Sequence, residues 1–499
     1  MELINANSKF EEKPKNSWKC FDYGEYQGHV SLFDSSITES EKIGKVIYVD
    51  DLEKRKQVYG ICGECKQPGT GEWWCHPCNS ERFKNNFNNW TSGNKDIDEF
   101  IQQSQLNAFY HKTVLEWVPF ENFQKINYLT SGGFGKIYSA IWTEGHITFW
   151  NIENQKWKRR SKEKVALKSL DNSSDISTEF LNEIKSHLQV HLYDVIQCHG
   201  ITQDPDTKDY MMILDFCEDG NLRNYLNKNY VGYESKIQKL FGISRGLLDI
   251  HNAGKVHKDF HSGNILFGYD NPYISDLGMC QPANVKAQRE GIYGVLPYMA
   301  PEVIRGHHYE KAADIYSFGI MMNEFISEEI PYNDIPHDDF LAIKICKGLR
   351  PNISQETPKL LSDLIIKCWD AKIENRPTTK ELCQILKRWS NSDYSKDGKD
   401  GNEIYSQIEN FDKISLKKFN NRTKKNNSKN IRTHPQAIYT SRLLNFKDLP
   451  KPVNSSNIQL NLVDTDYAIQ SAFENPIVSE CLDVQLSELD LNEIDEDDD

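Results

Sequence analysis

The sequence predicts an α+β fold for the middle of this 499-residue chain, and three observations lead to that expectation. Between residues 120 and 390, short apolar runs alternate with glycine turns and with long helical patterns. Hydrophobic residues make up 38% of the chain, which is enough for one sizeable core but low for a chain folded throughout. The last hundred residues are polar and carry separate basic and acidic blocks. We therefore expect one large folded domain with less ordered flanks.

Composition and charge narrow the classes of function. The net charge of −14 argues against a general nucleic-acid or membrane binder, because such surfaces need an excess of Lys and Arg. No run of about 18 apolar residues is present, so we expect no membrane span. The N-terminus lacks the basic start and apolar run of a secretory signal, and twelve cysteines then indicate reduced thiols. We expect an intracellular, cytoplasmic protein, with the nucleus as an alternative suggested by the basic stretch at 417–429.

Changes of composition divide the chain into four parts. A polar stretch at 1–54 is unassigned and expected to be partly disordered, and a cysteine-rich module follows it. The final part is expected to be mostly disordered, with a basic, Asn-rich block and an acidic end. The predicted boundaries are 1–54, 55–115 for the module, 120–390 for the large domain, and 391–499 for the tail.

Two C-x₂-C pairs lie close together in the module. They supply Cys62 and Cys65, then Cys75 and Cys78, with turn-forming Pro and Gly between them. Four thiolates make a closed tetrahedral Zn²⁺ site, and so short a segment needs a metal to stabilise it. A redox C-x-x-C and unliganded cysteines are the alternatives. His76 could replace a neighbouring ligand, although we expect it to point away.

A glycine-rich stretch opens the large domain. Gly132, Gly133 and Gly135 lie between two strand-like runs, LTS before them and KIYSA after them. Glycines allow a strand–turn–strand hairpin to approach phosphate groups closely, because no Cβ intervenes. The absence of a following helix argues against both a Walker loop and a Rossmann turn. Taken alone, such a hairpin is a weak signal.

Charged residues downstream strengthen the prediction of a phosphate site. The apolar strand VALK ends in Lys168, which could hold phosphate oxygens as a fixed charge. Glu183 follows in the helical pattern EFLNEIKSHLQV and could orient Lys168 through an ion pair. Two such residues are ordinarily solvated surface groups. Their position between the glycine hairpin and the motifs that follow favours pairing.

Two tight loops carry the most specific motifs. Within VHKDFHSGNILF, Asp259 could accept a hydroxyl proton, and Asn264 follows five residues later. Asp276 follows in YISDLG. Asn264 and Asp276 offer the hard oxygen ligands that Mg²⁺ uses when phosphate and water fill most of its shell. A purely structural reading would make Asp259 and Asn264 turn-forming residues.

The ordered set resembles the protein kinase family, with a Gly-rich loop, V-A-x-K, a helical Glu, H-x-D-x-x-x-x-N, D-x-G and A-P-E. The resemblance implies a two-lobed fold that transfers the γ-phosphoryl group of ATP to protein hydroxyls. It implies that Asp259 is the base, that Lys168 and Glu183 anchor the nucleotide, and that Asn264 and Asp276 hold Mg²⁺. It also implies an ion pair between Glu302 and Arg376 and a buried Asp314 that steadies the catalytic loop. The remaining residues implied to contact the nucleotide are Gly132, Gly133, Gly135, Ile137, Ala166, the gatekeeper Leu214, and the hinge residues Asp215 and Cys217.

The motif KCWD, the pair His261–Ser262 and the segment DIYSFGI are similar to the tyrosine-kinase-like group, whose members mostly phosphorylate Ser or Thr. The order of cysteine module, kinase domain and acidic tail also resembles expanded kinase families of mycorrhizal fungi. We expect protein substrates, ATP, Mg²⁺ and structural Zn²⁺, and tyrosine or dual specificity stays open. The alternatives are a pseudokinase scaffold and a zinc-dependent interaction protein. Nothing in the sequence indicates the oligomeric state.

Several positions depart from the family pattern. Lys258 replaces the arginine that clamps a loop phosphate, and the loop from Asp276 to Glu302 contains no Ser or Thr. We therefore predict that Ser/Thr phosphorylation in that loop is not the switch. Val295 and His261 stand where Ser/Thr kinases usually carry Thr and Lys. A long insertion before Lys168, HITFWNIENQKWKRRSKEK, is expected to be a surface insertion between two strands, with a solvated basic run.

Overall fold

A computed structural model describes residues 14–22, 26–31, 45–132, 135–169, 177–190, 194–283, 292–390, 401–424 and 433–454. All of them belong to one compact unit, Met1–Asn454. The fold is built from helices and sheets together, as the α+β prediction requires. Within the described ranges, no helix combines the length and the apolar run that crossing a bilayer requires.

A six-stranded sheet forms the first lobe of the large domain. Its strand order is β5-β11-β12-β10-β7-β6, and only β5 runs parallel to its neighbour. Apolar residues of these strands pack together in one buried cluster, including Val165, Leu167 and Trp142. The strands are β5 (Glu116–Trp117), β6 (Phe123–Gly132), β7 (Gly135–Trp142), β10 (Glu163–Ser169), β11 (Cys198–Gln203) and β12 (Tyr210–Asp215).

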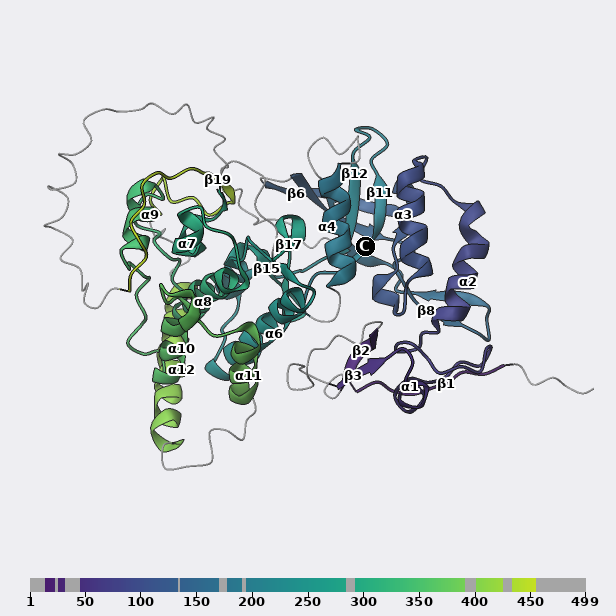
Figure 1. The fold of residues 1–499 in the computed structure, drawn as a ribbon, viewed down its shortest axis with the longest axis horizontal. Helices are drawn as coiled ribbons and strands as arrows, with labels where there is room; N and C mark the ends of the chain where they lie inside the picture. The colour runs from purple at the N-terminus through teal and green to yellow at the C-terminus, as the bar shows by residue number, and fades with distance from the viewer. Residues whose placement is uncertain are drawn as a thin grey trace, which may run out of the picture. The chain divides into compact units, whose positions relative to one another are not determined.

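One helix, α4 (Thr178–Gln189), completes this lobe. The Ser177 hydroxyl accepts a hydrogen bond from the Phe180 N–H and caps the helix. Phe180 and Ile184 are fully buried in one cluster with residues of β11 and β12 (Figure 1). This spacing of four residues keeps Glu183 on the inward side of the helix, where it is also buried.

The insertion before β10 forms a hairpin of β8 (Ile147–Asn151) and β9 (Lys156–Arg159). The sequence predicts a surface insertion here and not this hairpin, and the surroundings of the hairpin differ from that expectation. Trp157 stacks on Trp74 and Phe83 of the cysteine module, with ring centroids 5.8 and 4.9 Å apart. The aromatic residues of the insertion therefore form an internal contact surface, while Arg160 in its basic run stays exposed.

The cysteine module is larger than the predicted 55–115. Phe21 and Ile47, from the segment expected to be partly disordered, are buried with Val58 and Tyr59. Its remaining described elements are β1 (Ser17–Trp18), β2 (Tyr26–Ser31), β3 (Lys45–Tyr48), α1 (Leu52–Tyr59), β4 (Gly60–Ile61), α2 (His76–Asn86) and α3 (Lys95–Leu106). The N-terminal expectation also covers residues 1–13, 23–25 and 32–44, which lie outside the described residues.

The second lobe is mainly helical and contains the largest hydrophobic core cluster. Its central helix, α8, is buried along almost its whole length, which fits its nearly unbroken apolar sequence. The helices are α5 (Leu222–Lys228), α6 (Tyr233–Asn252), α7 (Pro301–Ile304), α8 (Lys311–Ser327), α9 (Asp339–Cys346), α10 (Lys359–Cys368) and α11 (Thr379–Ser390). Short strands flank the loops that contain Asp259, Asn264 and Asp276. These strands are β13 (Gly220–Asn221), β14 (Lys255–Val256), β15 (Ile265–Gly268), β16 (Asn271–Ile274) and β17 (Gln281–Pro282).

The tail departs most from the sequence prediction. Within 391–499, which we expected to be mostly disordered, the structure describes α12 (Gly401–Lys424) and an extended stretch at 433–454. Phe411 of α12 is buried against Tyr233, and Asp412 accepts a hydrogen bond from the Tyr233 N–H at 2.7 Å. The expectation is thus wrong for these two stretches, because apolar side chains spaced along them reach the main core. Residues 391–400, 425–432 and 455–499 lie outside the described residues.

The stretch at 433–454 follows the helical lobe closely. Its strand β19 (Arg442–Leu444) pairs antiparallel with β18 (Ile292–Gly294), and Leu444 is buried in the main core. Further along, the Val453 N–H donates to the carbonyl of Cys346 at the end of α9. Figure 1 shows this segment, in yellow, running past α7 and α9.

Candidate active site

Three charged side chains from distant parts of the sequence meet at the junction of the two lobes. The Nζ atom of Lys168 on β10 lies 2.7 Å from Oε1 of Glu183 on α4 and 2.8 Å from Oδ1 of Asp276. Burial alone would lower the pKa of Lys168, but the carboxylates of Asp276 and Glu183 raise it above its ordinary value. The ammonium group therefore keeps its charge inside the protein, as a phosphate-anchoring group must.

Asp276 and its neighbour Gly278 have unusual backbone requirements. Asp276 adopts a left-handed conformation with φ 59°, which an Asp tolerates better than most residues. A Cβ atom on Gly278 would lie 3.1 Å from Oε2 of Glu183 and 3.4 Å from Oδ1 of Asp276. A glycine at 278 thus lets the two carboxylates approach Lys168 together. Burial would raise the pKa of Asp276, but the charge of Lys168 outweighs it and lowers that pKa.

Several residues expected around a nucleotide lie on β10, which carries Lys168, and on its two neighbours in the sheet, β7 and β12. In the sheet register, Lys168 is opposite Ile137 on β7, and Ala166 is opposite Leu214 on β12. Cys217 follows directly after β12, where the chain leaves the sheet toward the helical lobe. The side chain of Asp215 instead accepts a hydrogen bond from the imidazole of His199, with 2.7 Å between the two atoms.

The glycine hairpin joins β6 to β7, as the sequence predicts. Gly132 pairs with Gly135, whose φ of 137° is a conformation that residues with a Cβ rarely adopt. Gly133 lies outside the described residues.

The catalytic loop predicted from VHKDFHSGN brings Asp259 and Asn264 together. The Asn264 side-chain amide donates to the Asp259 carbonyl at 2.9 Å. Since its nitrogen is engaged, the amide oxygen is the atom that Asn264 can offer to a cation. Asp276, with its side chain partly exposed, offers a carboxylate of the kind that Mg²⁺ prefers. The donor set of Asn264 and Asp276 fits a magnesium ion bound with phosphate.

Asp314, in the first turn of α8, holds the backbone of this loop in place. Its carboxylate accepts hydrogen bonds from the backbone N–H groups of His257 at 2.8 Å and Lys258 at 3.1 Å. It also bonds His251 and Tyr309, at 2.8 and 2.9 Å. Asp314 is fully buried, so these donors replace water and hold the loop backbone in one position.

Asp259 is buried but remains a carboxylate. Burial would raise its pKa, but attraction to His261, hydrogen bonds from His261 and Ser441, and attraction to His257 lower it to about 2. His261 Nε2 is 3.5 Å from Oδ2 of Asp259. Ser/Thr kinases usually carry a lysine at the position of His261. The Oδ1 atom is buried with no hydrogen-bond partner among the described residues. The carboxylate is therefore ionised above about pH 2, and its Oδ1 atom can act as a proton acceptor.

A polar network under the catalytic loop was not foreseen from the sequence. Ser262 Oγ lies 3.0 Å from the Tyr298 hydroxyl and donates to Glu324 at 3.1 Å. Arg223 donates to both Glu324 and Tyr298, at 2.7 and 2.9 Å. Only the pair His261–Ser262 hinted at it, since Arg223 and Glu324 are about a hundred residues apart. This network buries Tyr298, one of two tyrosines in the loop that lacks Ser and Thr.

The ion pair expected between Glu302 and Arg376 is present and bidentate. Two guanidinium nitrogens donate to the two carboxylate oxygens, at 2.6 and 2.8 Å. Both side chains are buried, so the pair ties helix α7 to the segment before α11.

The four cysteines of the module converge as predicted. Their sulfur atoms all lie within 4.8 Å of one another, with Cys62 to Cys78 at 3.9 Å and Cys65 to Cys75 at 3.5 Å. A tetrahedral zinc site with Zn–S bonds of about 2.3 Å places its sulfur atoms about 3.8 Å apart, so the cluster fits this ion. A hydrogen bond from the Cys75 thiol lowers the pKa of Cys62 to about 5, which favours the thiolate.

The shell around the cysteines is built from residues that sequence reasoning missed. Arg55 is buried and donates to the carbonyls of Gly69, Val49 and Pro68, at 3.0, 2.6 and 2.7 Å. His76 bonds the Leu106 carbonyl at 2.8 Å and stacks on Phe109, so it faces away from the sulfur atoms as expected.

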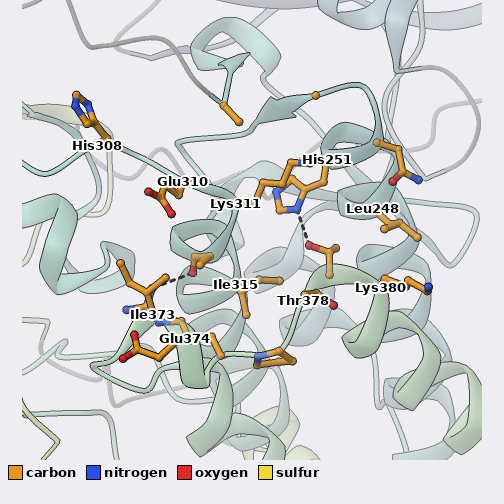
Figure 2. Close-up of a pocket in the computed structure, with 17 residues that line it drawn as sticks. Leu248, His251, His308, Glu310, Lys311, Ile315, Ile373, Glu374, Thr378 and Lys380 are labelled. Carbon is orange, nitrogen blue, oxygen red and sulfur yellow. Dashed lines mark hydrogen bonds between the residues drawn. The ribbon is translucent and has the colours of Figure 1, made fainter. Parts of the chain in front are cut away.

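A cavity of about 1140 Å³ lies in the helical lobe, away from these sites. Residues from the end of α6, the start of α8 and the segment before α11 line it (Figure 2). His251, Lys311 and Ile315 face it, and none of the residues predicted to bind a nucleotide does. His251, which lines the cavity, is hydrogen-bonded to Asp314. The cavity therefore lies next to the aspartate that holds the catalytic loop.

Comparison with known proteins identifies the large domain. The sequence model of the protein tyrosine and serine/threonine kinase family matches residues 123–386, which is more than half of the chain. The chain belongs to the protein kinase family. In this kinase the ion pair of Lys168 with Glu183 and the support of the Asp259 loop lie inside the matched region.

The curated relatives that this chain resembles are protein kinases. The probable serine/threonine-protein kinase gdt2 of Dictyostelium discoideum is 29% identical over 317 residues, 60% of this kinase but 18% of that relative. Mitogen-activated protein kinase kinase kinase 12 of Rattus norvegicus is 26% identical over 268 residues, 53% of this kinase and 27% of that relative. The serine/threonine/tyrosine-protein kinase HT1 of Arabidopsis thaliana is 24% identical over 267 residues, 53% and 65% of the two chains. The kinase thus spans less than a third of the first two relatives.

Proposed function

We propose that this protein is an active kinase that transfers the γ-phosphoryl group of ATP to Ser and Thr hydroxyls of proteins. The observation that carries the proposal is the position of Lys168 between Glu183 and Asp276, at 2.7 and 2.8 Å. An enzyme that had lost phosphate transfer would have no need to keep three charged side chains in this arrangement. The serine/threonine kinases among its relatives support the choice of acceptor.

Phosphoryl transfer depends mainly on positioning and on neutralising charge, and the chain offers groups for both. Lys168 would hold the triphosphate from the sheet side, while Ile137, Ala166 and Leu214 would enclose the base. Asp259 would orient the acceptor hydroxyl and take its proton, a role worth about 10²- to 10⁴-fold in rate. Asn264 and Asp276 would hold Mg²⁺, which supplies positive charge to the phosphates when bound.

A transfer assay with matched variants tests this function. The full chain is incubated with labelled ATP, Mg²⁺ and myelin basic protein as acceptor, followed by phosphoamino-acid analysis. We expect phosphoserine or phosphothreonine, abolished in Lys168→Met and Asp259→Asn. Lys164→Met, an exposed lysine on the same strand, is the control and should transfer at the normal rate. Transfer that survives in Asp259→Asn would exclude the assigned mechanism.

A pseudokinase scaffold and a zinc-dependent interaction protein are the competing functions. Both predict that the protein transfers no phosphate to itself or to an acceptor. The buried but ionised Asp259 disfavours them, because a scaffold has no use for a base that is kept charged inside the protein. The same assay separates all three.

We further propose the finer assignments that the motifs support. KCWD and DIYSFGI favour the tyrosine-kinase-like group, and the order of module, kinase domain and acidic end favours the expanded kinase families of mycorrhizal fungi. We assign the catalytic domain to residues 120–390 and a structural Zn²⁺ to the four cysteines of the module at 55–115. An intracellular site of action, in the cytoplasm or the nucleus, fits the unpaired thiols and the dependence on ATP.

A further inference from the structure

The segment 433–454, which we call the C-terminal strap, lies where a protein substrate of this kinase would bind. It is held at several points along the helical lobe by main-chain hydrogen bonds. The His434 N–H donates to the Asn333 carbonyl at 2.8 Å, and the His337 N–H donates to the Gln436 carbonyl at 3.0 Å. Such spaced contacts fix the register of the strap, so one particular residue reaches the catalytic loop.

That residue is Ser441. Its hydroxyl donates to Oδ2 of Asp259 at 2.5 Å, although the two residues are 182 positions apart. A general base must lie within hydrogen-bond distance of the proton that it removes, and this distance satisfies the condition. Thr440, the residue before Ser441, is exposed to solvent. The strap therefore presents the hydroxyl of Ser441 to the base, and not that of its neighbour Thr440.

The residues after Ser441 bind as an added strand. The strand β19 pairs with β18, which lies within the loop from Asp276 to Glu302. The paired residues are Arg442 with Gly294, Leu443 with Tyr293 and Leu444 with Ile292. Main-chain pairing of an extended segment with an exposed edge is a common way to bind peptides, and side-chain pockets then give specificity. Leu444 fills such a position, since it is 6% exposed and joins the main core.

Side chains on both sides of Ser441 anchor the strap further. Tyr439 donates to the Pro331 carbonyl at 2.7 Å, and its ring lies 4.2 Å from the guanidinium carbon of Arg223. Arg442 donates to the carbonyl of His337 at 2.6 Å. Arg223 belongs to the polar network under the catalytic loop, so the strap and the loop share a support.

We propose that Ser441 is a self-phosphorylation site, modified in cis by the kinase domain of its own chain. The inference rests on the proposed function, since it needs an active kinase. Ser441 Oγ attacks the γ-phosphorus of ATP and forms the new O–P bond. The bond from that phosphorus to the β,γ-bridging oxygen breaks, and ADP leaves with its electron pair. The hydroxyl proton passes to the carboxylate of Asp259 and then to water.

The same contact makes the strap a regulatory element. Before modification it fills the groove in front of Asp259 and excludes other substrates. After modification, a phosphate carrying a charge of about −1.5 to −2 stands against the buried carboxylate of Asp259. Like charges at this distance repel, so the strap leaves the groove and protein substrates gain access.

The first test maps the modification. The full chain, pretreated with a phosphatase that is then removed, is incubated with Mg²⁺ and ATP and digested for tandem mass spectrometry. We expect phosphate on Ser441, at a first-order rate that stays constant over a hundredfold range of protein concentration. Ser441→Ala should lose this phosphate, whereas Thr440→Ala, the neighbouring hydroxyl, should keep it. A rate that rises in proportion to protein concentration would overturn modification in cis.

The second test measures the regulatory consequence with myelin basic protein as the external acceptor. We expect a lag that shortens as Ser441 becomes modified, and a several-fold higher initial rate in Ser441→Asp. Ser441→Ala should stay at the slow initial rate. If the chain modifies the acceptor while Ser441 stays unmodified, this inference fails and the proposed kinase function stands. If it modifies neither, the proposed function itself fails.

Discussion

At the scale of single residues, the pairing of Glu183 with Lys168 makes a prediction that is separate from the loss of Lys168 itself. Glu183→Gln leaves Lys168 bonded only to Asp276, so its ammonium group can shift away from the phosphate position. A displacement of about 1 Å at a reacting group can reduce the rate by about 10²-fold. We expect kcat/KM for protein phosphorylation to fall by roughly that factor. Glu179→Gln, an exposed position on the same helix, is the control, and equal rates for the two variants would refute the role.

A second residue, His187, makes stability depend on pH. Burial lowers the pKa of His187 to about 4. The hydrogen bond between Nδ1 and the Ile196 carbonyl opposes this shift, as do the charges of Asp276 and Asp215, but these effects are outweighed. Between about pH 6.5 and 4 the unfolded chain binds a proton that the folded chain does not. The free energy of unfolding should therefore fall as the pH falls through this window, by about 3 kcal/mol from this group.

Denaturant unfolding from pH 7.5 to 4.5 checks this prediction. His187→Gln keeps a donor for the Ile196 carbonyl but does not titrate, so its stability should decline less with acid than that of the natural chain. His308→Gln replaces an exposed histidine and should follow the natural chain. Parallel curves for all three proteins would show that His187 is not protonated on unfolding.

The residues of the site differ in how far the sequence could predict them. Lys168, Asp259, Asn264 and Asp276 stand in short motifs whose spacing is set by tight loops, so local reasoning could reach them. Networks such as Ser262 with Glu324 depend on helices that meet only in the folded chain, and no local spacing reports that meeting. His261 was noticed only as a departure, and its distance to Asp259 required coordinates.

At the scale of elements, helix α3 links the cysteine module to the helix that carries Glu183. Ile97 and Ile101 are fully buried in one cluster with Phe180 and Ile184 of α4, and the Phe100 ring lies 5.9 Å from Lys185 Nζ. Helix α3 therefore docks on the kinase lobe.

Truncating that helix face should affect both stability and activity. Ile101→Ala removes buried methyl groups and should lower the free energy of unfolding by about 2–5 kcal/mol. Because the cluster also holds α4, the Glu183 side chain becomes less well placed and the rate of phosphorylation should fall. Thermal unfolding and the transfer assay measure the two effects. Gln103→Ala, an exposed change on α3, should alter neither, and a matching loss in this control would remove the argument for the buried face.

The elements of the tail show why composition misled the prediction. Helix α12 has a detectable signal, because Ile408, Phe411 and Ser415 recur at helical spacing and lie on its packed side. The strap has no such pattern. Its strand β19 is three residues long and is ordered by pairing with β18, about 150 residues away. Strands held by long-range pairing carry little local signal, so their order appears only in the folded chain.

At the scale of the whole molecule, the cysteine cluster supports the kinase lobe through a chain of contacts. Cys75 is followed directly by α2, whose Phe83 stacks on Trp157 of the inserted hairpin, and Trp74 stacks on the same ring. The Trp74 indole also donates to the Ala108 carbonyl at 2.8 Å, next to the segment that follows α3. Structural zinc contributes about 10–16 kcal/mol to the folding of finger peptides, so a module that holds the zinc we propose should not persist without it.

Removing one zinc ligand should therefore weaken the enzyme as well as the module. In Cys75→Ser we expect bound zinc, measured by elemental analysis, to fall from one per chain to near zero. The melting temperature should drop, because Trp157 and the face of α3 lose their cover, and the rate of phosphorylation should decline with the placement of α4. Cys20→Ser, an exposed cysteine outside the cluster, should retain metal, stability and activity. A Cys75→Ser protein without zinc that melted and phosphorylated like Cys20→Ser would show that the two lobes of the kinase need no support from the module.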